Sequence, residues 1–140
     1  MIIRDRISLS VDGGIARVEL ARPAKRNALD LPMFKAIVEA QKKLRGDRSV
    51  RAVVVSGQGE DFCSGLDIKA LMDDRAGMVR LLRKWLPWLS NLAQVVSTGW
   101  RRLPVPVIAA IHGTALGGGL EVALCAHYRV ALASAKFGLP

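Results

Sequence analysis

Gly117-Gly118-Gly119-Leu120-Glu121 is the stretch around which this chain is organised. The apolar run 105–111 precedes it, and residues 122–126 continue from it. Because the apolar run is β-rich and residues 120–126 suit a helix, the pattern predicts a buried strand that feeds a helix through a glycine turn. Three glycines remove every side chain from the turn, and the first N–H groups of a helix have no partner within it. Such N–H groups can hold an anion or a developing oxyanion.

Glu121 follows the glycines as an isolated acid, because no Asp or Glu occurs from Arg75 to Leu120. A lone carboxylate in an apolar setting beside such a turn is a candidate functional group. An acid in the first helical turn also stabilises a helix electrostatically while it faces water. The local sequence leaves both interpretations open.

The length of 140 residues fits one domain with a sizeable core, and no linker, repeat or low-complexity segment divides residues 1–140. No apolar run is long enough to cross a bilayer, and the start at Met1 lacks the apolar region of a signal peptide. Cys63 and Cys125 form neither a metal-ligand spacing nor a disulfide framework. We therefore expect a soluble cytoplasmic protein without a metal site, in which both cysteines are small buried residues.

The net charge of +9 allows a polyanionic partner. The excess Lys and Arg residues are spread along the chain, however, without a dense basic tract or interleaved aromatic side chains. A nucleic-acid partner is therefore allowed but not favoured. A small phosphorylated ligand would be served equally well, since it needs only a few correctly placed basic side chains.

The N-terminal third of the sequence predicts a hairpin followed by a helix. Residues 7–11 and 15–20 alternate in polarity around Asp12-Gly13-Gly14, which has the composition of a tight turn. After a basic loop over 22–29, Asp30 is a candidate N-cap for a helix from Leu31 to about Arg45. The apolar spacing of this helix suggests a buried stripe of Phe34, Ile37, Val38 and Leu44.

A second strand and glycine turn follow in the middle of the chain. Residues 51–56 predict a strand buried on both faces, and the small residues of 63–69 form a second turn before a second helix start. Gly57 and Gly59 do not make a dinucleotide-binding turn, because Phe62 occupies the third glycine position. Because each of the two helix starts follows a strand and a turn of small residues, the two turns can point backbone donors at a common atom.

The remaining sequence completes an α/β pattern. Residues 75–102 have helical spacing that Pro87 interrupts, and residues 128–133 predict another strand. Core or pocket-wall positions are expected for the tryptophans Trp85, Trp88 and Trp100. A solvated face is expected for the basic residues Arg80, Arg83 and Lys84. The alternation of strands and helices predicts an α/β protein.

Four motifs in this sequence resemble those of the crotonase, or enoyl-CoA hydratase/isomerase, superfamily. In chain order they are Arg22-Pro23 with Asn27-Ala28-Leu29, then Phe62 to Ile68, then Pro106 to Gly113, and then Gly117 to Glu121. Each motif alone is weak, but all four occur in family order over nearly the whole chain. The resemblance implies a crotonase-like spiral of ββα turns, incomplete at its C-terminus.

The resemblance also implies an oxyanion hole for an acyl-CoA thioester. By motif position, its two backbone N–H donors belong to Leu66 and Gly118. Backbone donors do not titrate, and two preorganised donors can stabilise the enolate-like charge on the thioester oxygen. In similar hydratases, the position of Glu121 is one of two glutamates that handle the added water, here the base.

For coenzyme A, the resemblance places the loop Ala24–Ala28 along the nucleotide and Lys69 just past the oxyanion turn. Lys25, Arg26 and Lys69 are therefore candidate phosphate contacts, and Ala28 and Gly65 are further candidate contacts. Each basic residue could equally be an ordinary surface charge. Coenzyme A would enter as part of the substrate, and no other cofactor is implied.

Two features depart from the family pattern. His127 stands where many relatives have Asp, so a local structural contact would differ, and we assign His127 no catalytic role. The resemblance ends at Pro140, about halfway along a typical member, where a second glutamate would come next. We therefore expect residues 1–140 to be the N-terminal portion of a longer frame that continues with an acidic residue, and to be inactive alone. In relatives the missing portion supplies much of the acyl pocket and the helices for assembly as a trimer or a dimer of trimers.

The function predicted from these residues is the addition of water to a 2-enoyl-CoA in fatty acid metabolism. Relatives with the same oxyanion hole catalyse isomerisation, hydrolysis and other acyl-CoA reactions, so the fold alone does not select the reaction. Glu121 favours hydration, because isomerases that resemble this family often lack an acid there. A silent CoA-binding protein or an RNA-binding protein is the alternative from another class, but no RNA-binding motif supports the second.

Overall fold

The computed structural model describes residues 1–83 and 91–139, and most of its strands form one mixed sheet. Six strands lie in the order β1 (Ile2–Ile3), β2 (Ile7–Asp12), β3 (Ile15–Leu20), β4 (Ala52–Gly57), β5 (Val107–Ile111) and β7 (Tyr128–Ala131). The first three strands pair antiparallel, whereas β3, β4, β5 and β7 are parallel neighbours. A smaller parallel pair joins β6 (Thr114–Leu116) to β8 (Lys136–Gly138).

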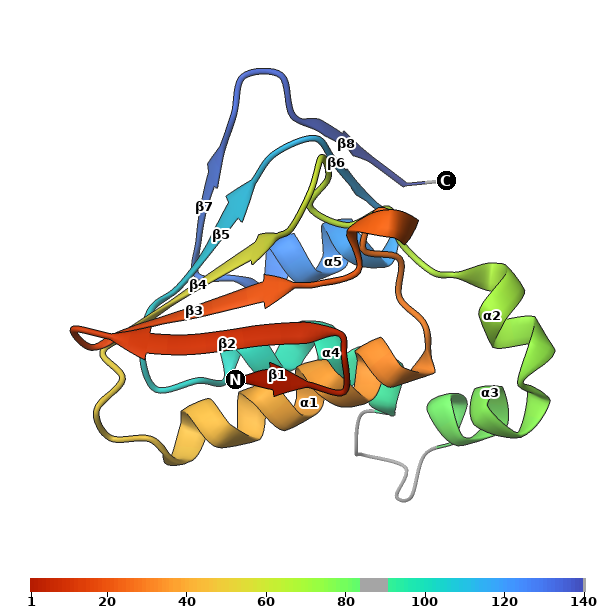
Figure 1. The fold of residues 1–140 in the computed structure, drawn as a ribbon, viewed down its shortest axis with the longest axis horizontal. Coiled ribbons are helices and arrows are strands. Elements are labelled where there is room, and N and C mark those ends of the chain that lie inside the picture. Colours follow the sequence, from red (N-terminus) through yellow and green to blue (C-terminus); the bar gives the residue numbers. More distant parts are fainter. Residues whose placement is uncertain (84–90, 140) are drawn as a thin grey trace.

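Among the described residues, three of the five α-helices cover one face of the large sheet. The helices are α1 (Leu31–Gly46), α2 (Ile68–Asp73), α3 (Arg75–Leu82), α4 (Leu92–Arg101) and α5 (Gly118–Cys125), and a 3-10 turn, η1, spans Pro23–Lys25. Figure 1 shows α1, α4 and α5 against the sheet, with α2 and α3 beside these layers, at the end toward which β3 and β4 point. Within the described ranges, each helix is too short or too polar to pass through a lipid bilayer.

The predicted hairpin is confirmed. Strands β2 and β3 pair in register from Ile7 with Leu20 to Asp12 with Ile15. The tip residues Gly13 and Gly14 have φ angles of 57° and 81°, values that glycine adopts without strain and that match the twist of the flanking strands.

Helix α1 also begins where the sequence predicts. The Asp30 side chain accepts a hydrogen bond from the Met33 N–H at 2.9 Å, which is the geometry of an N-cap. Three of the four predicted stripe residues are buried, and Val38 is only half-buried. The helix therefore presents its apolar stripe to the sheet, as the 3.6-residue spacing requires.

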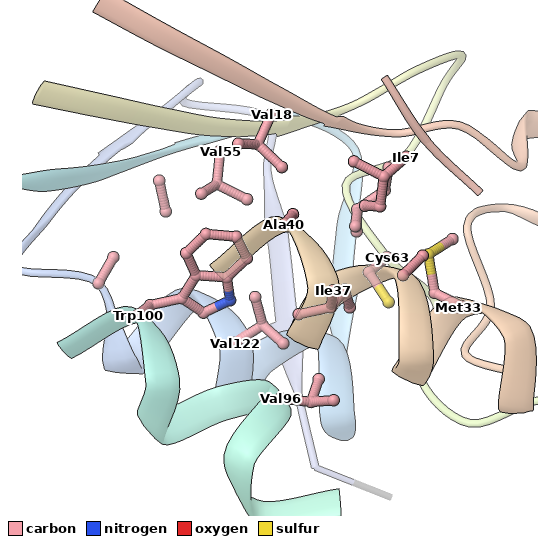
Figure 2. Packing of buried hydrophobic residues seen from close by; sticks show 14 of the residues in the cluster. Ile7, Val18, Met33, Ile37, Ala40, Val55, Cys63, Val96, Trp100 and Val122 are labelled. Atoms are coloured by element: carbon pink, nitrogen blue, oxygen red, sulfur yellow. The ribbon is translucent and has the colours of Figure 1, made fainter. Parts of the chain in front are cut away.

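The core lies between the sheet and the three helices. Figure 2 shows Val18 and Val55 of the sheet facing Trp100, Ile37 and Val122 of the helices. All five side chains are at most 2% exposed. The predicted core position of Trp100 is confirmed, whereas Lys84, Trp85, Pro87 and Trp88 lie outside the described residues.

Four parts of the fold differ from the sequence prediction. Strand β4 is fully buried on one face only, because its residues alternate between buried and half-buried. The apolar run ends as β5 at Ile111, and the short strand β6 leads into the glycines instead. Helix α5 begins at Gly118, two residues earlier than predicted, so Gly118 and Gly119 belong to its first turn. Strand β7 ends at Ala131 and all four of its residues are exposed.

Candidate active site

The two glycine turns predicted to carry the donors lie side by side. The Cys63 N–H donates to the Thr114 carbonyl at 3.0 Å, and the Leu116 N–H donates to the Cys63 carbonyl at 3.0 Å. Beyond these bonds, a Cβ atom on Gly119 would come within 2.5 Å of the Cys63 carbonyl oxygen. Only a residue without a side chain lets the first turn of α5 approach the 63–67 turn this closely.

Gly65, in the 63–67 turn, also allows this turn to lie close to the start of α5. Its φ of 99° is in the region that favours glycine, and a Cβ there would lie 2.9 Å from the Leu116 carbonyl oxygen. The same Cβ position is 3.8 Å from the Gly118 nitrogen, so the peptide before Leu66 and the start of α5 are neighbours. The structure thus brings together Gly65, Leu66 and Gly118, three residues predicted to serve the substrate.

The two predicted donors are free to bind a ligand. Within the described residues, neither the Leu66 N–H nor the Gly118 N–H donates a hydrogen bond. Both residues line a cavity of about 350 Å³, here called the outer cavity, together with Ile68, Leu116 and Leu139 among others. Both also line a cavity of about 130 Å³, the inner cavity, so these two residues form the boundary between the two spaces.

Glu121 lies on the inner side of this boundary. It is in the first turn of α5, is exposed, and lines the inner cavity together with a third space of about 340 Å³. Within the described residues, no side chain bonds to its carboxylate, which leaves the oxygens available to a water molecule or substrate. The same position suits an acid that stabilises the helix start, so the two interpretations of Glu121 are compatible.

Ser97 on α4 is a site residue that sequence reasoning missed. It is 7% exposed, lines the same two spaces as Glu121, and its hydroxyl has no hydrogen-bond partner within the described residues. The hydroxyl itself is not fully buried, because Trp100 Nε1 alone is a fully buried side-chain polar atom without a partner among the described residues. The Ser97 hydroxyl is therefore available to a bound water or ligand. Its only signal in the sequence is a small polar residue on the apolar stripe of a helix.

The predicted CoA-binding loop is held by Asn27, whose side chain is fully buried. Its Oδ1 accepts from the Arg22 N–H at 2.9 Å. Its Nδ2 donates to the carbonyls of Gln58 and Asp61, both at 2.9 Å, and of Phe62 at 3.3 Å. One amide therefore joins the loop to the segment that leads into the first glycine turn.

Arg26, one of the three predicted phosphate contacts, is paired with an acid. Its Nε lies 2.8 Å from Asp61 Oδ2, and Asp61 Oδ1 accepts from the Thr114 N–H and hydroxyl at 2.9 and 2.7 Å. The Arg26 hydrogen bonds hold the pKa of Asp61 well below its usual value, with help from Thr114 and against the opposing effect of burial.

The other two predicted phosphate contacts, Lys25 and Lys69, are exposed, and neither forms an ion pair within the described residues. Ala28 is half-buried in the same loop.

Three further residues singled out in the sequence are His127 and the two cysteines. His127 Nδ1 accepts from the Val107 N–H at 3.0 Å, and its Nε2 lies 3.2 Å from the Arg101 carbonyl, so the imidazole links β5 to the end of α4. Cys63 is buried, and burial raises the pKa of its thiol to about 11. Cys125, predicted to be buried, is half-buried. The described residues contain no cluster of three or more side chains that could hold a metal ion.

Comparisons with known proteins agree on one protein family. Residues 10–140 match the family described as enoyl-CoA hydratase/isomerase. The chain is 41% identical over 128 residues to a probable enoyl-CoA hydratase of Mycobacterium leprae, a match that covers 88% of this chain and 42% of the relative. It is 36% identical over 131 residues to a mitochondrial Delta(3,5)-Delta(2,4)-dienoyl-CoA isomerase of Mus musculus, covering 88% and 39% respectively.

A solved structure gives the same result. An enoyl-CoA hydratase/isomerase from Xanthobacter autotrophicus Py2 superposes with a TM-score of 0.85 at 34% identity, over 96% of this chain and 49% of that one. The chain therefore spans half or less of the length of these relatives.

Proposed function

Because this chain belongs to the enoyl-CoA hydratase/isomerase family of the crotonase superfamily, we propose that it carries the oxyanion hole and a catalytic carboxylate of a 2-enoyl-CoA hydratase. The fold is the crotonase-like α/β fold that the sequence predicted. One observation carries the proposal: Leu66 and Gly118, whose N–H groups are unbonded within the described residues, line both cavities, and Glu121 lines the inner one.

In this proposal the thioester oxygen accepts hydrogen bonds from Leu66 N–H and Gly118 N–H. Water adds to the β-carbon of the enoyl group, and the electrons of the double bond move toward the thioester oxygen as an enolate. Two fixed donors stabilise that charge more than the neutral carbonyl, which lowers the barrier. The reacting carbons lie on the side of Glu121, and the pantetheine arm follows the outer cavity.

Glu121 orients the water and accepts its proton as the new C–O bond forms. The α-carbon then takes up a proton, which completes the addition of H and OH. Among the described residues that line the three spaces, Glu121 is the one carboxylate, so a second acid would act from elsewhere.

For the phosphates of coenzyme A, we assign the contacts first to Lys25 and Lys69, because both are exposed and unpaired within the described residues. Arg26 uses Nε and one Nη for Asp61, which leaves its second Nη for a phosphate. Ala28 and Gly65 would contact the ligand through their main chain. From the family resemblance, we also propose that the full-length protein acts as a homo-oligomer.

The test is Glu121→Gln in the full-length gene product, assayed by the loss of enoyl-thioester absorbance. We expect acyl-CoA affinity to remain and hydration to fall by roughly two to four orders of magnitude, the scale of general acid–base assistance. Glu39→Gln on the outer side of α1, where Glu39 pairs with Arg4, is the matched control and should keep full activity. Unchanged turnover of short and long enoyl-CoAs by Glu121→Gln would remove Glu121 from the mechanism.

A second candidate function is double-bond isomerisation, which the name of the mouse relative favours. A panel of 2-enoyl-, 3-enoyl- and dienoyl-CoA substrates separates the two reactions, since only hydration gives a 3-hydroxyacyl product. A structure with bound acyl-CoA tests the oxyanion hole itself. A thioester oxygen beyond hydrogen-bond distance of both Leu66 N and Gly118 N would rule out the assignment.

A further inference from the structure

Arg22 lies at the centre of an ion-pair network next to the oxyanion turn. Its Nη1 donates to Asp67 Oδ2 at 2.8 Å and to the Ala28 carbonyl at 3.1 Å. Its Nη2 lies 3.4 Å from Asp30 Oδ2. The three charged side chains are between 7% and 16% exposed, so these contacts are shielded from much of the solvent.

Both carboxylates are helix N-caps. Asp30 Oδ1 accepts from the Met33 N–H at the start of α1, and Asp67 Oδ1 accepts from the Ala70 N–H at the start of α2. The Ala70 N–H and then Arg22 hold the pKa of Asp67 below its usual value. One guanidinium therefore ties the starts of two helices together, and the second helix follows the oxyanion turn directly.

The main chain connects this network to the Leu66 N–H. The Asp67 N–H donates to the Leu29 carbonyl at 3.0 Å, and the Leu29 N–H donates to the Gly65 carbonyl at 2.8 Å. The Gly65 carbonyl and the Leu66 N–H belong to one planar trans peptide, so they point in opposite directions. Because the carbonyl is held toward Leu29, the N–H is directed away from Leu29.

We propose that Arg22 is a positioning residue that aims the Leu66 N–H by fixing Asp67 and the Ala28 carbonyl. The proposal rests on the proposed function, because it gives that N–H the role of an oxyanion donor. Arg22 does not touch the substrate. It holds the strand-like contact between residues 28–29 and 65–67, through which the peptide plane before Leu66 is set.

Arg6 provides a matched control within the same network. Its Nη2 lies 2.8 Å from Asp30 Oδ2 and its Nε 3.1 Å from Asp30 Oδ1, with 23% of the side chain exposed. Within the described residues, the Arg6 side chain forms no hydrogen bond or ion pair with Asp67 or with the 63–67 turn. If Arg22 contributed only to stability, Arg22→Met and Arg6→Met should have the same effect on the Leu66 peptide and on kcat.

The first measurement is made without substrate. Amide order parameters and hydrogen exchange are compared for the original protein, Arg22→Met, Arg6→Met and Asp67→Asn, whose amide can still cap α2. In Arg22→Met and Asp67→Asn we expect the Leu66 order parameter to fall from about 0.85 toward 0.6. The Asp67 and Leu29 amides should exchange roughly tenfold faster than in Arg6→Met, because their mutual contact opens more often.

The second measurement is the kinetics of the full-length protein. We expect Arg22→Met to lower kcat by roughly ten- to a hundredfold, short of the loss from deleting one oxyanion donor, while KM changes little. Arg6→Met should keep kcat per folded molecule, and Arg22→Lys should restore part of the loss because an ammonium can still pair with Asp67. If Arg22→Met does not fold, the kcat values of Asp67→Asn and Arg22→Lys still decide whether the contact between Arg22 and Asp67 affects catalysis.

Two results would overturn the proposal: equal Leu66 order parameters in Arg22→Met and Arg6→Met, or an unchanged kcat in both Arg22→Met and Asp67→Asn. Absence of any acyl-CoA reaction in the unsubstituted protein would refute the proposed function instead. The order parameters would still decide whether Arg22 positions the Leu66 peptide, so the two failures are distinguishable.

Discussion

Two adjacent glycines in α5 should respond very differently to the same substitution. A Cβ on Gly118 would meet Leu29 Cδ1 at 3.0 Å, a flexible side-chain end that can move by a few tenths of an ångström. A Cβ on Gly119 would meet the Cys63 carbonyl oxygen at 2.5 Å and Cys63 Cβ at 2.7 Å. That carbonyl also accepts the Leu116 N–H, so relief of the clash would disturb the contact between the two turns.

The expected changes in unfolding free energy follow from two opposing effects. Replacing a helical glycine by alanine gains about 1 kcal/mol of helix propensity. For Gly118→Ala, the tight contact with Leu29 offsets part of this gain, so we expect a change of about 0–1 kcal/mol in unfolding free energy. For Gly119→Ala, overpacking against rigid backbone costs about 3 kcal/mol, the upper end of its usual range, which leaves a net loss of about 2 kcal/mol.

Thermal unfolding followed by circular dichroism tests the difference. For a chain of 140 residues, a loss of about 2 kcal/mol corresponds to a fall in Tm of about 8 °C. Gly118→Ala should remain within about 3 °C of the original protein. Equal Tm values for Gly118→Ala and Gly119→Ala would refute the inference that α5 is packed against Cys63 through the absent side chain.

Three other predictions concern stability and the inner cavity. Because Asp61 has a lowered pKa in the folded state, its contribution to stability is complete above the unfolded pKa of about 4 and is lost as pH falls below it. Urea midpoints measured from pH 7 to pH 3 should therefore fall less steeply in Asp61→Asn, and identical slopes would contradict the role of the Arg26 pair. Ser97→Val should fold normally but lower the rate of hydration about fivefold, the equivalent of one neutral hydrogen bond of about 1 kcal/mol; an unchanged kcat would show that the hydroxyl serves no bound water. His127→Phe should reduce the unfolding free energy by about 1–3 kcal/mol, since it leaves the Val107 N–H without an acceptor, and should not change kcat per folded molecule; a catalytic defect with unchanged stability would reverse that assignment.

Local patterns account for the parts of the fold that the sequence predicted. The turn composition of Asp12-Gly13-Gly14 and the alternation around it are sufficient to define the hairpin, because all its contacts are between near neighbours. The N-cap at Asp30 is equally local, since its partner Met33 is three residues away. The convergence of Leu66 and Gly118 was predicted from motif resemblance, and the packing at Gly65 and Gly119 gives its physical cause.

The features that were missed depend on long-range contacts. Strands β6 and β8 have three residues each, too few for a period-2 pattern to emerge, and they exist because each pairs with the other. The helix start at Gly118 was placed too late, because intrinsic propensity assigns glycine to turns and tertiary packing overrides it here. The Arg22–Asp67 and Arg26–Asp61 pairs join residues 45 and 35 positions apart, and nothing in the local sequence specifies which acid each arginine meets.

The fully buried amide of Asn27 has a consequence for how related sequences would be compared. An aspartate there would face three carbonyl oxygens with a negative charge, and an apolar residue would leave those carbonyls without their donor. Substitution would thus be removed by selection as strictly as at a residue that touches the substrate. A search for functional residues by evolutionary rate alone would rank Asn27 beside Glu121, although one forms the loop and the other is proposed to act on the water. Folding and chemistry can impose the same evolutionary constraint, and only the contacts of the side chain distinguish them.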